Sequence, residues 1–65
     1  MTAPLDELPK VGAPATRALT AAGFTTLRAL IDADRKQLAQ LHGVGPKALR
    51  IIDEALAAHG YSLSG

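Results

Sequence analysis

The chain has 65 residues, which is enough for one domain near the lower size limit at which a hydrophobic core alone stabilises a fold. It has no cysteine, which excludes a disulfide and a thiolate metal site, and its formal net charge of +1 excludes a strongly basic protein. Alanine and leucine dominate the hydrophobic content of 48%, with one Phe and one Tyr, so we expect an all-α domain with small, closely packed side chains.

The first half of the chain is expected to form three short helices. Pro4 at a first helical position predicts an opening helix over 4–8, with two acids in its favoured first turn. Small apolar residues at helical spacing predict a helix over 13–22, which Gly23 ends. A threonine at position 25 or 26 is expected to cap a connecting helix that continues to about residue 31.

The second half is expected to form two helices and a tail. Asp34 begins a capping-box pattern for a helix over 35–41. A longer helix over 46–59 has its apolar residues on one face. The tail is expected to return the apolar side chains of 61–63 to the core and to fray at 64–65.

The turn over 41–50, between these two helices, carries the main candidate site. Gly43 can take the positive φ that a reversal needs, and Pro46 suits a first helical position. The helix start then presents free N–H groups and a positive dipole end, which favour an anion. Lys47 and Arg50 add positive charge there, at a cost of roughly 0.3 to 1 kcal/mol that a bound phosphate would offset. Alternatively, both are solvated surface residues whose apolar stems cover the core.

The chain also aligns with itself at an offset of thirty-three residues. Seven of the eighteen positions from Leu5 to Ala22 are identical to their counterparts from Leu38 to Ala55. Such an internal repeat indicates two copies of one helix, turn and helix unit. The identical pairs are Leu5 and Leu38, Leu8 and Leu41, Val11 and Val44, Gly12 and Gly45, Ala15 and Ala48, Arg17 and Arg50, and Ala22 and Ala55.

The second turn resembles the helix-hairpin-helix motif, with an apolar residue, Gly, an apolar residue, Gly, and then Ala and aliphatic residues. Two such motifs joined by a connector resemble the double helix-hairpin-helix domain over essentially the whole chain. The resemblance implies one compact five-helix (HhH)2 domain over 1–65. Its parts are motif 1 at about 4–23, a connector at 24–33, motif 2 at about 34–60 and a tail at 61–65. The connector and residues 57–63 also resemble the C-terminal domain of the bacterial RNA polymerase alpha subunit, which binds the DNA minor groove.

The resemblance implies a small DNA-binding module that is largely insensitive to sequence. Its hairpin amides and basic side chains would contact backbone phosphates along the minor groove, and such contacts position a protein without carrying sequence information. The implied DNA-binding residues of the second hairpin are His42, Gly43, Val44, Gly45, Lys47, Ala48 and Arg50. Those of the first hairpin are Lys10, Gly12 and Arg17.

The first hairpin departs from the second at two of its positions. Lys10 stands where the second copy has Gly43, and Pro14 stands where it has Lys47, which removes an N–H and a charge. We therefore expect weak, salt-sensitive binding of double-stranded DNA, dominated by the second hairpin, with a Kd of roughly 10⁻⁴ to 10⁻⁶ M.

A protein-interaction or scaffold module with the same fold is the alternative function. In that case Lys47 and Arg50 are incidental, and an exposed apolar patch marks the partner's surface. Clustering of basic residues on one face, away from the acids, favours DNA instead. The basic residues concerned are Lys10, Arg17, Lys47 and Arg50, and the acids are Asp32, Asp34, Asp53 and Glu54.

Neither catalysis nor a metal centre is expected. His42 and His59 have no ligand-spaced partner, and the Ser and Thr residues form no triad pattern. The resemblance implies one cofactor candidate, a monovalent cation held by hairpin carbonyls near Leu41 and Val44. Neither a signal-peptide pattern nor an apolar run of about 18 residues occurs, so we expect a cytoplasmic, nucleoid-associated monomer without membrane contact.

Overall fold

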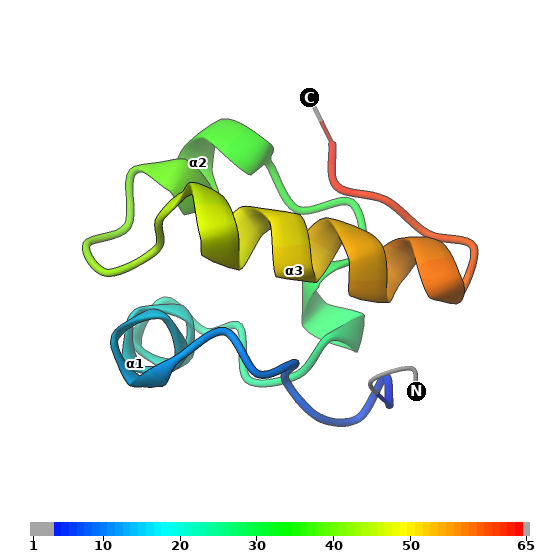
Figure 1. Cartoon of the computed structure of the whole chain (residues 1–65), viewed down its shortest axis with the longest axis horizontal. Helices are drawn as coiled ribbons and strands as arrows, with labels where there is room; N and C mark the ends of the chain where they lie inside the picture. Colours follow the sequence, from blue (N-terminus) through cyan, green and yellow to red (C-terminus); the bar gives the residue numbers. More distant parts are fainter. Residues whose placement is uncertain (1–3, 65) are drawn as a thin grey trace.

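Helix α3 (Pro46–Ala58) is the longest element and runs along the longest axis of the molecule (Figure 1). The structure is a computed structural model and describes residues 4–64. Besides α3, the described residues contain α1 (Ala13–Ala21), α2 (Arg35–Ala39) and one turn of 3-10 helix, η1 (Arg28–Leu30). The all-α class predicted from composition is confirmed.

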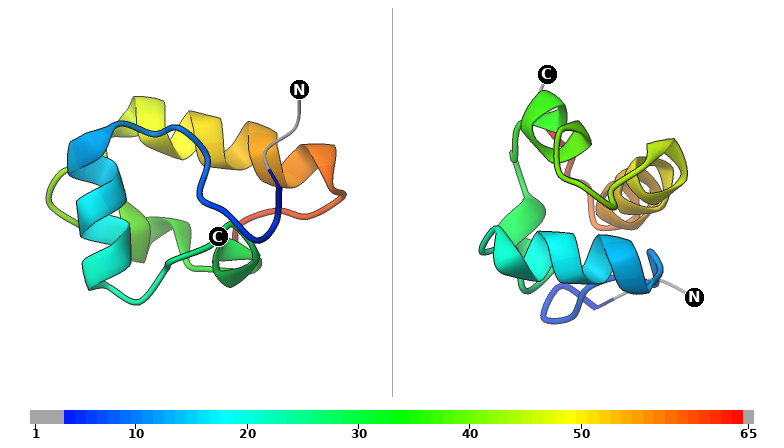
Figure 2. Two further views of the ribbon diagram at one scale, coloured as in Figure 1. Left: turned by 90° about the horizontal axis from the view of Figure 1, so that it is seen from below. Right: turned by 90° about the vertical axis from the view of Figure 1, so that its left-hand side faces the viewer.

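The core lies between α3 and the segments that surround it. Ala48, Ile52, Ala55 and Leu56 of α3 are buried, at the i, i+4, i+7 and i+8 spacing of one helix face. Leucines and small residues from the other segments complete the core, namely Ala15, Leu19, Leu27, Leu30, Leu38, Val44 and Leu63. Figure 2 shows α1 crossing α3 steeply near the N-terminal end of α3. The two helix starts therefore lie side by side.

The prediction of five helices is wrong, because the described chain forms three helices and one 3-10 turn. The opening segment 4–8 forms only a turn, closed by the Glu7 N–H donating to the Pro4 carbonyl at 3.2 Å. Two carbonyls that a helix would use, those of Leu5 and Glu7, instead accept amides from the connector, at 2.8 and 3.0 Å. Pro9 also disfavours helical dihedrals for the residue before it. Hydrogen bonds between the opening segment and the connector therefore form in place of a short helix.

The connector forms a single 3-10 turn rather than the predicted helix through about residue 31. Leu27 is at the N-cap position, and the Thr26 side chain before it accepts the Ala29 N–H through Oγ1 at 3.2 Å. The turn ends at once, since Ile31 is extended and Asp32 has a φ of 62°, outside the helical region. The left-handed dihedrals of Asp32 cannot continue a right-handed helix, so a second turn does not form.

Helix α2 is shorter than predicted and is held to α3 by charge. Asp34 caps it as expected, with Oδ1 accepting the Lys36 N–H at 2.9 Å. Arg35, its first residue, makes two hydrogen bonds to Asp53 of α3, at 2.6 and 2.8 Å. This bidentate ion pair fixes α2, and with it the hairpin that follows, against the longest helix.

The tail pairs with the segment before α2. Ser64 forms an isolated parallel bridge with Asp34, and its N–H donates to the Ala33 carbonyl at 2.8 Å. The prediction of a frayed Ser64 is therefore wrong, while Gly65 lies outside the described residues. Leu63 is buried in the core as predicted, but Tyr61 is 44% exposed and does not return to the core. This isolated parallel bridge thus anchors the tail, with Leu63 as its apolar contact.

The internal repeat in the sequence matches the structure where α1 and α3 begin. The match is lost further along the two helices. Gly12 and Gly45 are the N-caps of α1 and α3, which is an offset of 33 residues. The positive-φ glycines that follow the helices, Gly23 and Gly60, are 37 residues apart. Helix α3 is thus longer by four residues, 13 against 9, so the identity of Ala22 with Ala55 has no structural counterpart.

Candidate nucleic-acid interface

The two hairpin turns meet each other directly. Gly43 has a φ of 98°, as the reversal between α2 and α3 was predicted to need. Its Cα also faces the first turn of α1, where a Cβ atom would lie 2.7 Å from the Pro14 carbonyl oxygen. Gly43 therefore serves both the turn and the contact between the hairpins.

Gly45 is different, because nothing in the fold requires a glycine there. Its φ of −103° is accessible to any residue. A Cβ built on it meets nothing within 4 Å. The missing side chain at Gly45 leaves the adjoining backbone open to a molecule outside the chain.

The second hairpin has a cluster of unused backbone donors. Pro46 and the residues around it begin α3, where N–H groups have no helical acceptor. Within residues 4–64, four N–H groups of this hairpin donate to no carbonyl or side chain. They are those of Gly43, Gly45, Lys47 and Ala48.

The first hairpin has open N–H groups at its helix start too, in shifted positions. Pro14 has no N–H where its counterpart Lys47 has one. One position earlier the relation reverses, because Ala13 has an N–H where the second hairpin has Pro46. The first hairpin therefore loses the charge of Lys47 without losing a donor. Its open N–H groups are those of Gly12, Ala13 and Ala15.

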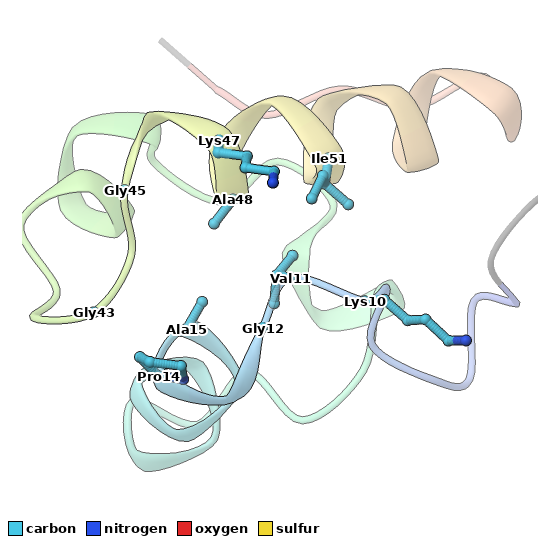
Figure 3. Close-up of a pocket in the computed structure, with 10 residues that line it drawn as sticks. All are labelled: Lys10, Val11, Gly12, Pro14, Ala15, Gly43, Gly45, Lys47, Ala48 and Ile51. Atoms are coloured by element: carbon cyan, nitrogen blue, oxygen red, sulfur yellow. The ribbon is translucent and has the colours of Figure 1, made fainter.

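Both hairpins open onto one groove of about 440 Å³ between the starts of α1 and α3 (Figure 3). Aliphatic side chains line it from both sides, and the polar side chains in the lining are two lysines, Lys10 and Lys47. Figure 3 shows Lys47 lying along the α3 side of the groove, whereas Lys10 points away from it. The remaining lining residues are Val11, Gly12, Pro14, Ala15, Gly43, Gly45, Ala48 and Ile51.

The other basic candidates lie one helical turn from the groove. Arg17 follows Pro14 by three residues and Arg50 follows Lys47 by three, so each lies on the same side of its helix as a groove residue. Both side chains belong to exposed residues. No acidic residue occurs in the segments 8–31 and 35–52, which contain both hairpins.

Ion pairing separates the cations into two groups. Arg28 lies 3.4 Å from Asp6, and Arg35 is held by Asp53, whose hydrogen bonds and charge raise the pKa of the Arg35 guanidinium. Five cations have no carboxylate within 4.0 Å in the described part of the chain. These are Lys10, Arg17, Lys36, Lys47 and Arg50, which include all four basic candidates from the sequence.

Three other candidates have unequal access to a ligand. His42 is exposed in the turn but does not line the groove. Val44 is 6% exposed, and its N–H donates to the Leu41 carbonyl at 3.1 Å, so its amide is already used. Ala48 has a buried side chain, so only its N–H is available. Among residues 4–64, no three His, Cys, Asp or Glu side chains gather in a way that could hold a metal ion.

Four residues of the groove are not among the candidates predicted from the sequence. Ala15 and Val11 were noted only as members of the repeat, and Pro14 only as a departure. Ile51 was noted only as one of the aliphatic residues of the motif, although it follows Lys47 by four residues and so lies on the same helix face. Helical spacing from Lys47 was the one signal that could have identified it.

Comparison with known proteins identifies the family of this chain. The chain matches no curated protein sequence. The model of one family matches residues 3–57, which includes both hairpins, the connector and most of α3. The chain belongs to the SAM-like helix-hairpin-helix tandem family.

Proposed function

We propose that this domain binds double-stranded DNA without sequence preference, by holding backbone phosphates on both sides of a minor groove. Tandem helix-hairpin-helix domains typically bind DNA. The observation that carries the proposal is the single groove onto which both hairpins open, with unused N–H groups on each side. Unused N–H groups at both hairpins could each bind one of the two phosphate backbones of a duplex.

The binding energy would come from the backbone donors, the helix dipoles and the unpaired cations. A phosphate oxygen accepts hydrogen bonds from the N–H groups at a helix start, where the dipole also favours negative charge. Lys47 and Arg50 add charge on the second hairpin, and neither is engaged by a carboxylate in the described chain. With two to four phosphates neutralised, the slope of log Kobs against log salt should be about −2 to −4.

The second hairpin should dominate binding. It has Lys47 at the second position of its helix, where the first hairpin has the uncharged ring of Pro14. Lys10, the counterpart of Gly43, points away from the groove in Figure 3. Phosphate affinity should therefore be stronger at α3 than at α1.

Two features favour DNA over a protein partner for this surface. In the described part of the chain, Tyr61 is the one exposed large hydrophobic residue, and it follows α3 at the end opposite to the hairpins. One exposed large side chain is less than the contiguous apolar patches that mark protein interfaces. The unpaired cations, in contrast, cluster along acid-free segments.

From the sequence resemblance of the connector and of residues 57–63 to the C-terminal domain of the RNA polymerase alpha subunit, we further propose that the domain binds at the minor groove. A shared role beyond that would be analogy from the fold. We propose a non-enzymatic monomer that acts on the cytoplasmic nucleoid. No described helix has the length and apolar character that crossing a membrane requires.

Titration of a short fluorescent DNA duplex at low and at physiological salt tests the proposal. Lys47→Glu should weaken binding more than Lys36→Glu, which changes the net charge equally but lies on α2, outside the groove. The double variant Lys47→Glu/Arg50→Glu should nearly abolish binding. If the native chain does not bind the duplex at low salt, the proposal is wrong. Equal effects of the two single variants would show that net charge alone attracts the DNA.

A further inference from the structure

An acidic side chain lies next to one of the cations of the second hairpin on α3. Asp53 follows Arg50 by three residues, and side chains three or four positions apart on a helix are neighbours. An aspartate and an arginine at this spacing can form an ion pair. In the described part of the chain, however, the exposed Arg50 has no carboxylate within 4.0 Å. Helical spacing alone does not explain why the two side chains stay apart.

The Asp53 carboxylate is already occupied by an arginine from another helix. Arg35 is the first residue of α2, which packs beside α3 (Figure 1). Its Nη1 donates to Oδ2 of Asp53 at 2.6 Å, and its Nη2 donates to Oδ1 at 2.8 Å. Such bidentate, charge-assisted hydrogen bonds are among the stronger ones in proteins. Because both oxygens are used and the charge is neutralised, little attraction remains for a second guanidinium.

Arg50 can serve either a phosphate or Asp53, but not both. Long side chains on a helix lean toward its N-terminus. For Arg50 that direction leads to Lys47 and to the open N–H groups of the second hairpin. An ion pair with Asp53 would draw the guanidinium back toward the C-terminal end of α3. The availability of Arg50 to a ligand therefore depends on what holds Asp53.

Asp53 needs a cationic partner more than its neighbour Glu54 does. The side chain of Asp53 is only 35% exposed, and a partly buried charge that loses its partner is costly. Glu54 is exposed, so water solvates its carboxylate, and no Lys or Arg within residues 4–64 lies within 4.0 Å of it. Without Arg35, helical spacing makes Arg50 the replacement partner of Asp53.

We propose that Arg35 is a positioning residue for DNA binding, because it holds both oxygens of Asp53 and so keeps Arg50 free for a phosphate. The inference rests on the proposed function, since it assumes that Arg50 meets the backbone of a duplex. Helix α2 contributes no residue to the groove. It nevertheless determines, through one ion pair, how much positive charge the second hairpin offers.

The test is a titration of the fluorescent duplex over a series of salt concentrations with variants of the full chain. Arg35→Gln should weaken binding roughly two- to fivefold and make the slope of log Kobs against log salt shallower by about 1, because Asp53 then captures Arg50. Lys36→Gln is the matched control. It removes the same charge from the next residue, which is exposed and has no carboxylate within 4.0 Å in the described chain. It should change the affinity by less than about twofold and leave the slope nearly unchanged.

Removing a carboxylate as well distinguishes the release of Arg50 from a merely structural role of Arg35. Arg35→Gln/Asp53→Asn should restore the native affinity and slope. Arg35→Gln/Glu54→Gln has the same net charge but keeps the carboxylate that Arg35 held, so it should stay weak. In an Arg50→Gln background, adding Arg35→Gln should cause no further change of slope. A loosened α2 would weaken binding in both double variants alike.

The outcomes separate this inference from the proposed function. If the native chain does not bind the duplex at low salt, both are wrong. If it binds and Arg35→Gln loses no more affinity than Lys36→Gln, only the inference is overturned. Equal recovery, or none, in the Asp53→Asn and Glu54→Gln double variants overturns it too. Should Arg35→Gln fail to fold, Arg35→Lys makes the test at unchanged net charge. Lysine cannot hold both oxygens, so the affinity should fall and Asp53→Asn should restore it, whereas an unchanged affinity contradicts the inference.

Discussion

The carbonyl oxygen of Pro14 lies 2.7 Å from the position that a Cβ atom would occupy on Gly43. These residues belong to different hairpins, so their contact sets how the starts of α1 and α3 lie against each other. A single glycine thus couples the local geometry of one turn to the spacing of the whole candidate interface.

Gly43→Ala should therefore destabilise the fold more than the same change at Gly23. Both glycines have nearly the same φ, 98° and 96°, so the backbone strain of roughly 1–3 kcal/mol is common to both. Only Gly43 adds a backbone clash, because a Cβ on Gly23 meets nothing within 4 Å. Urea unfolding of the two variants gives the difference. Equal losses of stability would show that the hairpins separate freely.

Gly45→Ala should leave the fold intact and weaken DNA binding. The dihedrals of Gly45 suit alanine and its surroundings leave room, so the unfolding free energy should change by less than about 1 kcal/mol. The added methyl group would instead obstruct a phosphate approaching the N–H groups of the second hairpin. Unfolding and duplex titration of the same variant test both parts, and unchanged binding would argue against a phosphate at this turn.

Pro14→Lys should strengthen DNA binding by making the first hairpin resemble the second. The change supplies an N–H and a positive charge at the position equivalent to Lys47. One added phosphate contact should steepen the slope of log Kobs against log salt by about 1. Pro14→Gln is the control, since it restores the N–H without the charge. A slope that is the same for both variants would mean that position 14 does not face a phosphate.

Arg35→Lys should lower the unfolding midpoint, and the loss should not vary from neutral pH to about pH 10. Lysine cannot reproduce the two hydrogen bonds to Asp53. The pair raises the pKa of the Arg35 guanidinium further above its already high usual value, so its stabilisation is fully present across this range and is lost only when the pH rises through that pKa. Arg28→Lys is the control, because its contact with Asp6 is 3.4 Å long and highly exposed, and the midpoint should hardly change. Midpoints that shift equally in both variants would show that the geometry at Asp53 is unimportant.

Leu63→Ala should destabilise the domain by about 2–5 kcal/mol, as for other buried leucines. Leu63 is 7% exposed and lies beside the bridge between Ser64 and Asp34. Tyr61→Ala, two residues earlier, should have little effect because Tyr61 is 44% exposed. Unfolding curves of the two variants provide the comparison. Similar stabilities would mean that the tail is dispensable to the core.

The features that were predictable from the sequence are those that depend on neighbouring residues. Asp34 caps α2, Gly43 takes a positive φ, and Pro46 begins α3, because each is a preference of one residue within a few positions. The open N–H groups of the second hairpin follow from the same local pattern. The repeat at an offset of 33 residues located both helix starts for the same reason.

The features that were not predictable depend on segments far apart in the sequence. The opening segment has helical preferences, yet the carbonyls of Leu5 and Glu7 pair with connector amides, and this decides against a helix. Pairing with Asp6 and Asp53 likewise decides which arginines are unavailable to a ligand.

By itself, the sequence determined the class, the two hairpin turns and the donors at their helix starts. Propensity, capping and glycine conformation act over a few residues, so these features were already specified locally. Only the tertiary structure decided that the turns meet through Gly43 and Pro14 and that Ile51 faces a groove. These relationships depend on how α1 crosses α3, and that crossing results from packing the whole core.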